Sequence, residues 1–343
     1  AGIVLLSKCE LFNLRVMRSK PMGLILAGGR SQRLFPLNIP KPLLEVHGRF
    51  LLSEALERLK GFDTYVIANR DIAKEIVRAF RSKGLRIPKF LIEPVGRDTA
   101  AAVGFGIRKA IQMRAPWVAV LSADHWMPQT KSFPSFLRRV GKEVACYPDA
   151  LFVSGSAAST KSRDAYSQFG WIVPQKRGVG FSSPVENFVE KPSGKKLEQL
   201  LKKRALINGG VFFGKTAAWK SAFKSFFPDV LNSKIPFETL PRMPVDKAIF
   251  ERFENVRVIA QKLQWEDLGT WEDWARLNLS KTRDSKLIRV PRGSGVFSKT
   301  DCVKEIYAFG VSDLAIIESA GKLLVMPLSE SRHMKTYLKG MRP

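Results

Sequence analysis

The chain has 343 residues, 45% of them hydrophobic and 10% aromatic, a composition that predicts a globular core and excludes a disordered chain. Its 57 Lys and Arg against 31 Asp and Glu give a net charge of +26, while three cysteines and three histidines do not indicate a disulfide framework or a histidine-rich metal site. No apolar run is long enough to span a bilayer and no signal peptide is recognisable, so we expect a cytoplasmic protein without a membrane partner.

Apolar runs alternate with amphipathic segments through the first two thirds of the chain. The apolar runs are predicted strands, and the segments between them, with apolar residues spaced near 3.6, are predicted helices. The predicted strands are 22–25, 64–69, 89–94, 117–124 and 151–157, and the predicted helices are 53–62, 72–84 and 101–113. This alternation predicts an α/β fold with a Rossmann-like, mostly parallel sheet and helices on both faces.

The segment 26–42, LAGGRSQRLFPLNIPKP, follows the first predicted strand and joins two glycines to three basic residues, Arg30, Arg33 and Lys41. Glycine lets the backbone approach a ligand closely, and the cations favour an anionic one. The segment is not a Walker A loop, because the Gly-Lys-Ser/Thr ending is absent, and it lacks the GxGxxG dinucleotide pattern. Taken alone, it is also compatible with a surface turn that carries solvated cations.

Further polar residues follow other predicted strands. Glu93 comes at the end of the third strand and Asp124 after the fourth. Because ligands bind at the carboxyl ends of the strands in parallel sheets, we expect a binding site at this edge.

From about residue 286 the pattern changes to short predicted strands separated by turns, with no long helix before residue 330. Residues 1–21 show no clear periodicity. We therefore expect an N-terminal extension over 1–21, a main α/β domain over 22–282 and a small β-rich domain over 283–343 that ends in a helix.

Segment 26–42 fits the pattern LAGGxGxRLxPLxxxxPKP in most positions. Further segments follow it in chain order: EPVGRDTAAA (93–102), LSADHWMP (121–128), FGWI (169–172), FVEKP (188–192), INGGVFF (207–213), PVDKAIFE (244–251), WEDLGTW (265–271) and GVSDLAIIES (310–319). Together these segments resemble the signatures of sugar-nucleotide pyrophosphorylases and, within that nucleotidyltransferase family, the bacterial mannose-1-phosphate guanylyltransferases.

The resemblance implies a reaction in which mannose 1-phosphate attacks the α-phosphorus of GTP in line, with Mg²⁺ assistance. Diphosphate is released, and GDP-mannose is the product. Such chemistry depends on positioning and on charge stabilisation, and needs no nucleophilic side chain. The resemblance also implies that 22–282 is the catalytic domain, that the C-terminal domain is a short β-helix, and that a homodimer forms through that domain.

The resemblance further assigns site residues. It implies catalytic roles for Arg33, Lys41 and Lys191, and Mg²⁺ binding by Asp124 and Asp267, either of which could instead be a turn residue. It implies nucleotide binding by Leu26, Ala27, Gly28, Gly29, Arg33, Glu93, Asp98 and Thr99. It implies sugar binding by Gly170, Glu190 and Asn208.

Four positions depart from the family pattern. Ser31 replaces the second motif glycine, which is tolerated where φ is negative and strained where φ is positive. Asp98 replaces an Asn, Gly209 replaces a Ser, and Lys247 stands where a Tyr is usual. These departures leave the preferred base and sugar open.

Three alternatives remain at this point. One is a pyrophosphorylase of the same fold that uses another sugar 1-phosphate and nucleotide. Another is a non-catalytic regulatory paralogue, against which the retained Arg33, Asp124, Lys191 and Asp267 argue. The third is a basic nucleic-acid-binding module, which the sequence does not favour because no zinc-finger, helix-turn-helix or RNP pattern accompanies the charge.

Overall fold

The computed structural model describes residues 20–127, 133–158, 166–175, 180–260, 266–279, 288–289, 297–299, 306–308 and 310–341. The chain divides into two compact units that do not follow chain order. The first contains the chain up to Gly28, residues 52–123 and residues 127–265. The second contains 29–51, Asp124–Trp126 and Glu266–Pro343. The predicted extension, apart from residues 20–21, and the predicted boundary at 282 and 283 lie outside the described residues.

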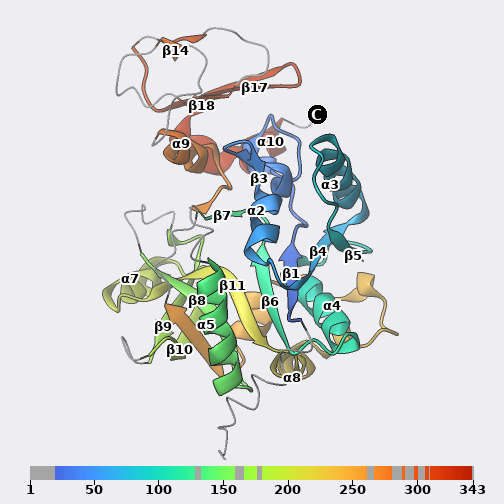
Figure 1. Ribbon diagram of the computed structural model, residues 1–343. Coiled ribbons are helices and arrows are strands. Elements are labelled where there is room, and N and C mark those ends of the chain that lie inside the picture. Colours follow the sequence, from blue (N-terminus) through green and yellow to red (C-terminus); the bar gives the residue numbers. More distant parts are fainter. Residues whose placement is uncertain are drawn as a thin grey trace, which may run out of the picture. The chain divides into compact units, whose positions relative to one another are not determined.

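The first unit is built on a nine-stranded sheet in the order β5-β4-β1-β6-β11-β8-β12-β10-β9 (Figure 1). Its strands are β1 (Met22–Leu26), β4 (Asp63–Asn69), β5 (Lys89–Glu93), β6 (Trp117–Ser122), β8 (Leu151–Ala157), β9 (Gly170–Pro174), β10 (Ser183–Glu190), β11 (Leu206–Lys215) and β12 (Val256–Ala260). The helices that accompany it are α2 (Leu51–Arg58), α3 (Arg70–Ser82), α4 (Asp98–Gln112), α5 (Phe133–Cys146), α7 (Gly194–Lys202) and α8 (Thr216–Phe226). The five predicted strands and three predicted helices are all confirmed.

The sheet is mixed, but seven of its nine strands run in one direction, as the prediction of a mostly parallel sheet requires, and only β10 and β11 run against them. Strands β5, β4, β1 and β6 run parallel to one another, and β12 runs parallel to β8. In contrast, β11 runs antiparallel to both β6 and β8, and β10 runs antiparallel to β9 and β12. Only residues 175–182 separate β9 from β10, too few for the crossover that a parallel pair requires.

Helices cover both faces of this sheet, as the sequence predicts. Neighbouring side chains of β11 point to opposite faces: the ring of Phe212 stacks on Phe250 at 4.4 Å, and that of Phe213 contacts Phe136 of α5 at 6.0 Å. Helices α4 and α8 pack with Phe212 in the main core cluster. Among the described residues, helices therefore cover both faces of the sheet, and the strand ends are the places where we expect a ligand.

Local capping explains how one strand gives way to the next helix. The side chain of Asn69, the last residue of β4, accepts a hydrogen bond from the backbone N–H of Ile72 at 2.9 Å. An Asn at this position satisfies an N–H group that the helix itself leaves unpaired. The α3 helix therefore begins directly after the strand, without an intervening loop.

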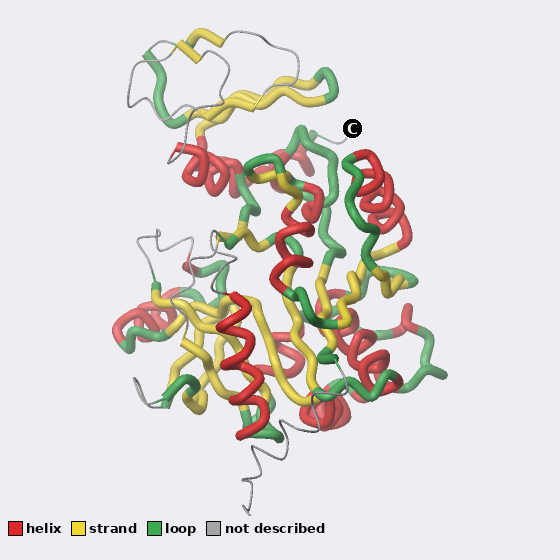
Figure 2. Tube along the Cα trace, viewed as in Figure 1, coloured by secondary structure: helices red, strands yellow, loops and turns green. Residues whose placement is uncertain are grey.

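The second unit contains short elements. They are the 3-10 turns η1 (Gln32–Leu34), η2 (Lys41–Leu43) and η6 (Leu328–His333), the helices α9 (Trp271–Leu279) and α10 (Met334–Gly340), and the strands β2 (Glu45–Val46), β3 (Arg49–Phe50), β7 (His125–Trp126), β13 (Glu266–Asp267), β14 (Ile288–Arg289), β15 (Phe297–Lys299), β16 (Ile306–Tyr307), β17 (Leu314–Ser319) and β18 (Lys322–Pro327). Figure 2 shows β17 and β18 as a paired ribbon.

The core of the second unit joins segments that are distant in sequence. Leu34, Leu44, Trp271, Ala315 and Leu328 belong to one buried cluster, and the indole N–H of Trp271 donates to the Phe35 carbonyl at 2.9 Å. In the described part of the tail, β15 pairs in parallel with β17 and β14 with β16. A short β-helical domain over 283–343 stays a prediction. No helix among the described residues has the length and apolarity to cross a membrane.

Two helical glycines allow a matched test of core packing. A Cβ on Gly104 of α4 would lie 2.3 Å and 2.7 Å from the two methyl carbons of Val230, whereas a Cβ on Gly141 of α5 would meet nothing closer than Trp117 at 3.7 Å. We expect Gly104→Ala to destabilise the protein, because overpacking costs about 1–3 kcal/mol and outweighs the gain of about 1 kcal/mol in helix propensity.

Gly141→Ala is the matched control and should stabilise the protein by up to about 1 kcal/mol. Urea unfolding midpoints measure both changes. A Gly104→Ala variant as stable as Gly141→Ala would show that α4 does not pack closely on Val230.

Candidate functional site

In the first unit, the loop after β1 leaves the sheet at a fixed point. The Ala27 N–H donates to the Ile67 carbonyl at 2.9 Å, and the Leu26 carbonyl accepts from the Ala123 N–H at 3.0 Å. Both neighbours of β1 therefore hold the chain just before Gly28. Gly28 is exposed, and a Cβ there would make only an ordinary contact, 3.6 Å from the Glu93 carboxylate. Leu26, Ala27, Gly28 and Glu93, four of the predicted nucleotide-binding residues, thus lie close together.

The carboxylate of Glu93 is buried, and the residue is 5% exposed. Burial raises its pKa to about 7. Its Oε1 atom has no hydrogen-bond partner among the described residues. An unpaired buried acceptor is costly, so this atom indicates a ligand that donates to it.

Asp98 and Thr99 begin α4, close to Glu93 in sequence. Asp98 adopts a left-handed conformation with φ of 64°, and its carboxylate accepts from the Thr99 N–H at 2.7 Å. Asp and Asn both tolerate this conformation, so the departure from the family Asn preserves the backbone. The Thr99 hydroxyl accepts from the Val245 N–H at 2.8 Å, which engages it inside the protein. Nucleotide contacts by these two residues stay a prediction.

Gly170, Glu190 and Asn208 also lie together. Gly170 and Glu190 are paired across β9 and β10. A Cβ on Gly170 would lie 2.6 Å from Glu190 Oε2 and 3.3 Å from Asn208 Nδ2. The missing side chain of Gly170 therefore lets a carboxylate and an amide pack against its backbone, close to each other.

Lys191 follows β10 and has a left-handed backbone, with φ of 50°. Its N–H donates to the Phe169 carbonyl at 3.2 Å, and its ammonium lies 3.3 Å from Glu190 Oε1. The Lys191 side chain is half-exposed, so it can leave Glu190 for another anion.

The sequence interpretation missed Asp246, although it lies in segment 244–251. Asp246 begins a π-helix (η5, Asp246–Phe250), and its carboxylate accepts from Asn208 Nδ2 at 2.7 Å. Burial of the carboxyl group and the nearby charge of Glu190 raise its pKa to about 7. Residues 208 and 246 are 38 positions apart, so only the resemblance of segment 244–251 could have indicated this acid.

In the second unit, the glycine-rich loop is folded back on itself. The Lys41 N–H donates to the Gly29 carbonyl at 3.2 Å, and a Cβ on Gly29 would lie 3.5 Å from the Lys41 side chain. The Lys41 ammonium forms an ion pair with Asp124 at 2.6 Å, and both side chains are largely buried. A catalytic candidate and a metal-binding candidate from distant parts of the sequence are therefore in direct contact.

Ser31 resolves the first departure from the family pattern. Its φ is −82°, so the position requires no glycine. Ser31 is buried, and its hydroxyl donates to the Ile39 carbonyl across the loop. Arg33 lies half-buried in η1, next to Leu34 in the core of this unit. The loop is thus anchored on both sides of Arg33.

A short ribbon in the same unit carries the second predicted metal ligand. Strand β13 pairs with β7 so that Asp267 lies opposite His125, one residue beyond Asp124. The backbones of Asp124 and Asp267 are therefore neighbours.

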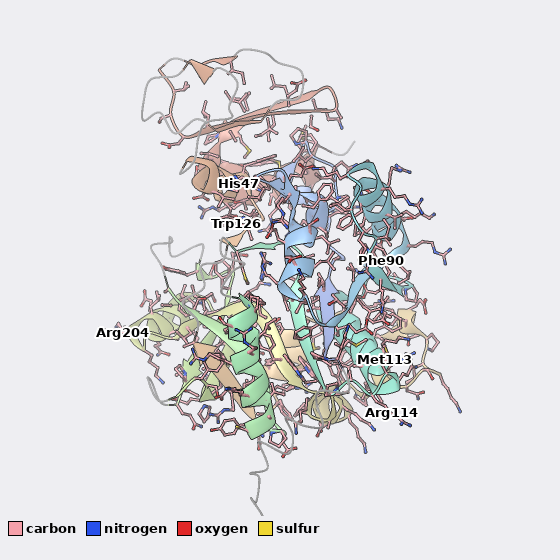
Figure 3. The ribbon with its side chains drawn as sticks, in the orientation of Figure 1. His47, Phe90, Met113, Arg114, Trp126 and Arg204 are labelled. Carbon is pink, nitrogen blue, oxygen red and sulfur yellow. The ribbon has the colours of Figure 1, made fainter. Side chains whose placement is uncertain are left out.

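The same ribbon contacts the turn between β2 and β3. The Trp126 ring meets the His47 ring edge-on at 6.4 Å (Figure 3). His47 and Gly48, both with positive φ, form the two-residue turn between β2 and β3.

The described side chains contain no group of three or more His, Cys, Asp or Glu that could hold a metal ion. The side chain of Asp267 lies outside this description. Asp124 offers carboxylate oxygens, the ligand type that Mg²⁺ prefers alongside substrate phosphates. The donor chemistry of the predicted pair therefore suits a hard cation that substrate oxygens would also bind.

The sequence matches a known protein family over most of its length. A family model described as nucleotidyl transferase matches residues 22–283. The chain belongs to this family. Membership in the nucleotidyl transferase family confirms the prediction of a nucleotidyltransferase enzyme.

Individual nucleotidyl transferases agree with the sequence resemblance. Mannose-1-phosphate guanylyltransferase 2 from Escherichia coli O157:H7 is 24% identical over 94% of this chain and 73% of its own length. A mannose-1-phosphate guanylyltransferase from Klebsiella pneumoniae is 25% identical over 92% and 72%. A crystal structure described as a mannose-1-phosphate geranyltransferase from Thermus thermophilus is 26% identical, covers 94% of this chain and 99% of its own, and has a TM-score of 0.79. The resemblance and the mixed α/β nucleotidyltransferase fold are confirmed.

The geometry of Ser31 predicts the effect of restoring the family glycine. Ser31→Gly should lower stability by about 1–2 kcal/mol, because it removes a hydrogen bond worth about 1 kcal/mol and adds backbone freedom. Ser31→Ala removes the hydrogen bond alone and should lower stability by about half as much. Urea unfolding measures the difference. A glycine variant more stable than the alanine variant would contradict the observed loop conformation.

Proposed function

We propose that this nucleotidyl transferase is a mannose-1-phosphate guanylyltransferase, which converts GTP and α-D-mannose 1-phosphate into GDP-mannose and diphosphate. The names of the relatives from Escherichia coli and Klebsiella pneumoniae support this reaction. The observation that carries the choice of nucleotide is the buried carboxylate of Glu93, whose Oε1 has no hydrogen-bond partner among the described residues.

The chemistry of Glu93 matches guanine. An ionised carboxylate only accepts hydrogen bonds, and it can accept two at once. Guanine presents two adjacent donors, N1–H and N2–H, on one edge, whereas adenine and cytosine present one donor beside an acceptor, and uracil one donor between two acceptors. Glu93 therefore favours GTP over the other three nucleotides.

The position of Gly28 supports the same ligand. No described protein atom forbids a side chain there, since a Cβ would lie 3.6 Å from Glu93. The absence of a side chain is then explained by a base or ribose that approaches the backbone beside Glu93. Leu26 and Ala27, fixed by their hydrogen bonds to both neighbouring strands, would hold this part of the loop still.

Transfer of the nucleotidyl group needs cations where charge accumulates on the leaving diphosphate. Arg33 would bind the β- and γ-phosphates, and Lys41 the α-phosphate or the leaving group. Lys191 would bind the phosphate of the sugar. Each lysine already lies against a carboxylate, Lys41 against Asp124 and Lys191 against Glu190, so each is oriented before substrate arrives.

Mg²⁺ would be held by Asp124 and Asp267, whose backbones lie at adjacent positions of the β7–β13 ribbon. When bound, the ion neutralises charge on phosphate oxygens. Asp98 and Thr99 would support the nucleotide from the start of α4. Gly170, Glu190 and Asn208 would bind sugar hydroxyls, since a carboxylate acceptor and an amide donor lie close together against the backbone of Gly170. A homodimer through the C-terminal strands remains part of this proposal, to be tested by light scattering.

The proposed reaction predicts which nucleotide and which residues matter. Purified protein with Mg²⁺ and mannose 1-phosphate should release diphosphate with GTP much faster than with ATP, UTP or CTP. Asp124→Asn and Asp267→Asn should each lower kcat by roughly 10²-fold or more, the usual effect of removing one group that stabilises developing charge.

Glu93→Gln provides the matched control for base choice. The amide keeps the shape of Glu93 but accepts only one of the two guanine donors, so the GTP-to-ATP ratio of kcat/KM should fall at least about tenfold. If the enzyme uses another sugar 1-phosphate and does not use mannose 1-phosphate, the proposed sugar substrate is wrong. A folded protein that turns over no pair would support the regulatory paralogue.

The raised pKa of Glu93 predicts a pH dependence. Below about pH 7 the carboxyl group is protonated and loses an acceptor, and above it the group is ionised and accepts both guanine donors. KM for GTP should therefore fall as pH rises through about 7. In Glu93→Gln this fall should disappear, while effects from the titration of GTP itself persist. An equal pH profile in both proteins would remove Glu93 from the base site.

A further inference from the structure

We propose that Asp246 is a positioning residue that determines which sugar hydroxyl arrangement the enzyme accepts, by holding the amide of Asn208 in one orientation. This inference rests on the proposed function, because it concerns the sugar side of the same reaction. Nothing in the resemblance assigned a role to Asp246, and the contact with Asn208 is visible only in the folded chain.

Both ends of the Asn208 amide are held. Its Nδ2 donates to Asp246 at 2.7 Å, and its Oδ1 accepts from the Gly210 N–H at 2.9 Å. Because the Gly210 N–H can only donate and the ionised Asp246 can only accept, the oxygen of the amide faces Gly210 and its nitrogen faces Asp246. The second N–H of Asn208 remains available as a donor of known position.

That donor lies beside an acceptor, because Asn208 and Glu190 both pack against the backbone of Gly170. A Cβ at Gly170 would lie 3.3 Å from Asn208 Nδ2 and 2.6 Å from Glu190 Oε2, so both atoms border the same point. Glu190 is an acceptor and Asn208 Nδ2 is a donor. A sugar hydroxyl both donates and accepts one hydrogen bond with such partners, so this pair fits a hydroxyl at one position and in one orientation.

Asp246 is itself held rigidly. The Ala100 N–H donates to the Met243 carbonyl at 3.0 Å, and the Val245 N–H donates to the Thr99 hydroxyl at 2.8 Å. On the other side, Ala248, Ile249 and Phe250 are buried in the main core. The start of α4 and the core thus fix the backbone that carries Asp246. A rigid acceptor can impose an orientation on Asn208, whereas a mobile one could not.

The decisive variant exchanges the two side chains, Asn208→Asp together with Asp246→Asn. The exchanged pair still forms its hydrogen bond, with Asn at 246 donating to Asp at 208, and Asp at 208 still accepts from Gly210. The atom that faces the sugar becomes an acceptor instead of a donor. The double variant should therefore be about as stable as the wild type, while its kcat/KM for mannose 1-phosphate should be at least about tenfold lower than that of the wild type.

Two single variants complete the set. Asp246→Asn keeps an acceptor for Asn208 and should retain most activity. Asp246→Ala releases the amide, so the preference for mannose 1-phosphate over glucose 1-phosphate should fall at least about tenfold while KM for GTP is unchanged. Gly104→Ala, which loses stability far from these residues, is the control that should keep the epimer preference.

A purely structural role for Asp246 predicts different results. If the exchanged pair restores both stability and sugar preference, or if Asp246→Ala folds and keeps the epimer ratio, the inference is wrong. The measurements use mannose, glucose, galactose and N-acetylglucosamine 1-phosphates. If the wild type prefers one of the other three, the proposed function fails, and the ratios for that sugar still decide the role of Asp246. A folded wild type that uses none of them overturns both.

Discussion

The site of the first unit depends on two carboxyl groups, those of Glu93 and Asp246, that have lost most of their contact with water. Glu93 is buried and Asp246 is enclosed enough that the pKa of each rises to about 7. A carboxylate in such surroundings loses hydration that is worth several kcal/mol and needs donors in return. Asp246 receives one donor from Asn208, while Glu93 Oε1 receives none from the described protein. In the proposed function, this difference distinguishes Asp246, which orients a protein side chain, from Glu93, which would bind a ligand.

Hydrophobic pattern alone was sufficient to predict the strands and helices of the first half of the chain. Each of β1, β4, β5, β6 and β8 is a short apolar run, and the pattern reports burial directly. It does not report strand direction, because a buried strand looks the same whichever way it runs. The mixed sheet follows instead from short connections such as residues 175–182, and from the direction in which β11 enters between β6 and β8.

The candidate site was predictable where family segments carry the residues and not where tertiary contacts decide their roles. Gly170, Glu190 and Asn208 were assigned to one site from the family segments, and Gly28 and Glu93 were both expected at the carboxyl ends of strands; each set lies close together. The ion pair between Lys41 and Asp124 joins residues 83 positions apart, and no pattern in either segment indicates it. The same holds for the Thr99 hydroxyl, which supports the backbone next to Asp246. Such contacts depend on how loops fold, and the spacing of apolar residues does not predict loop conformation.

In a chain with a net charge of +26, two of the lysines proposed to bind phosphate are each held by an ion pair with a carboxylate. Lys41 is largely buried against Asp124, and the half-exposed Lys191 lies against Glu190, so each ammonium has a carboxylate partner. A phosphate oxygen can replace a carboxylate oxygen at a lysine with little change in desolvation, because one anion takes the place of another. In the proposed reaction, this exchange at Lys41 would release the carboxylate of Asp124 at the moment a phosphate arrives. Nucleotide binding would therefore prepare a ligand for the metal, and neither charge would be left buried without a partner.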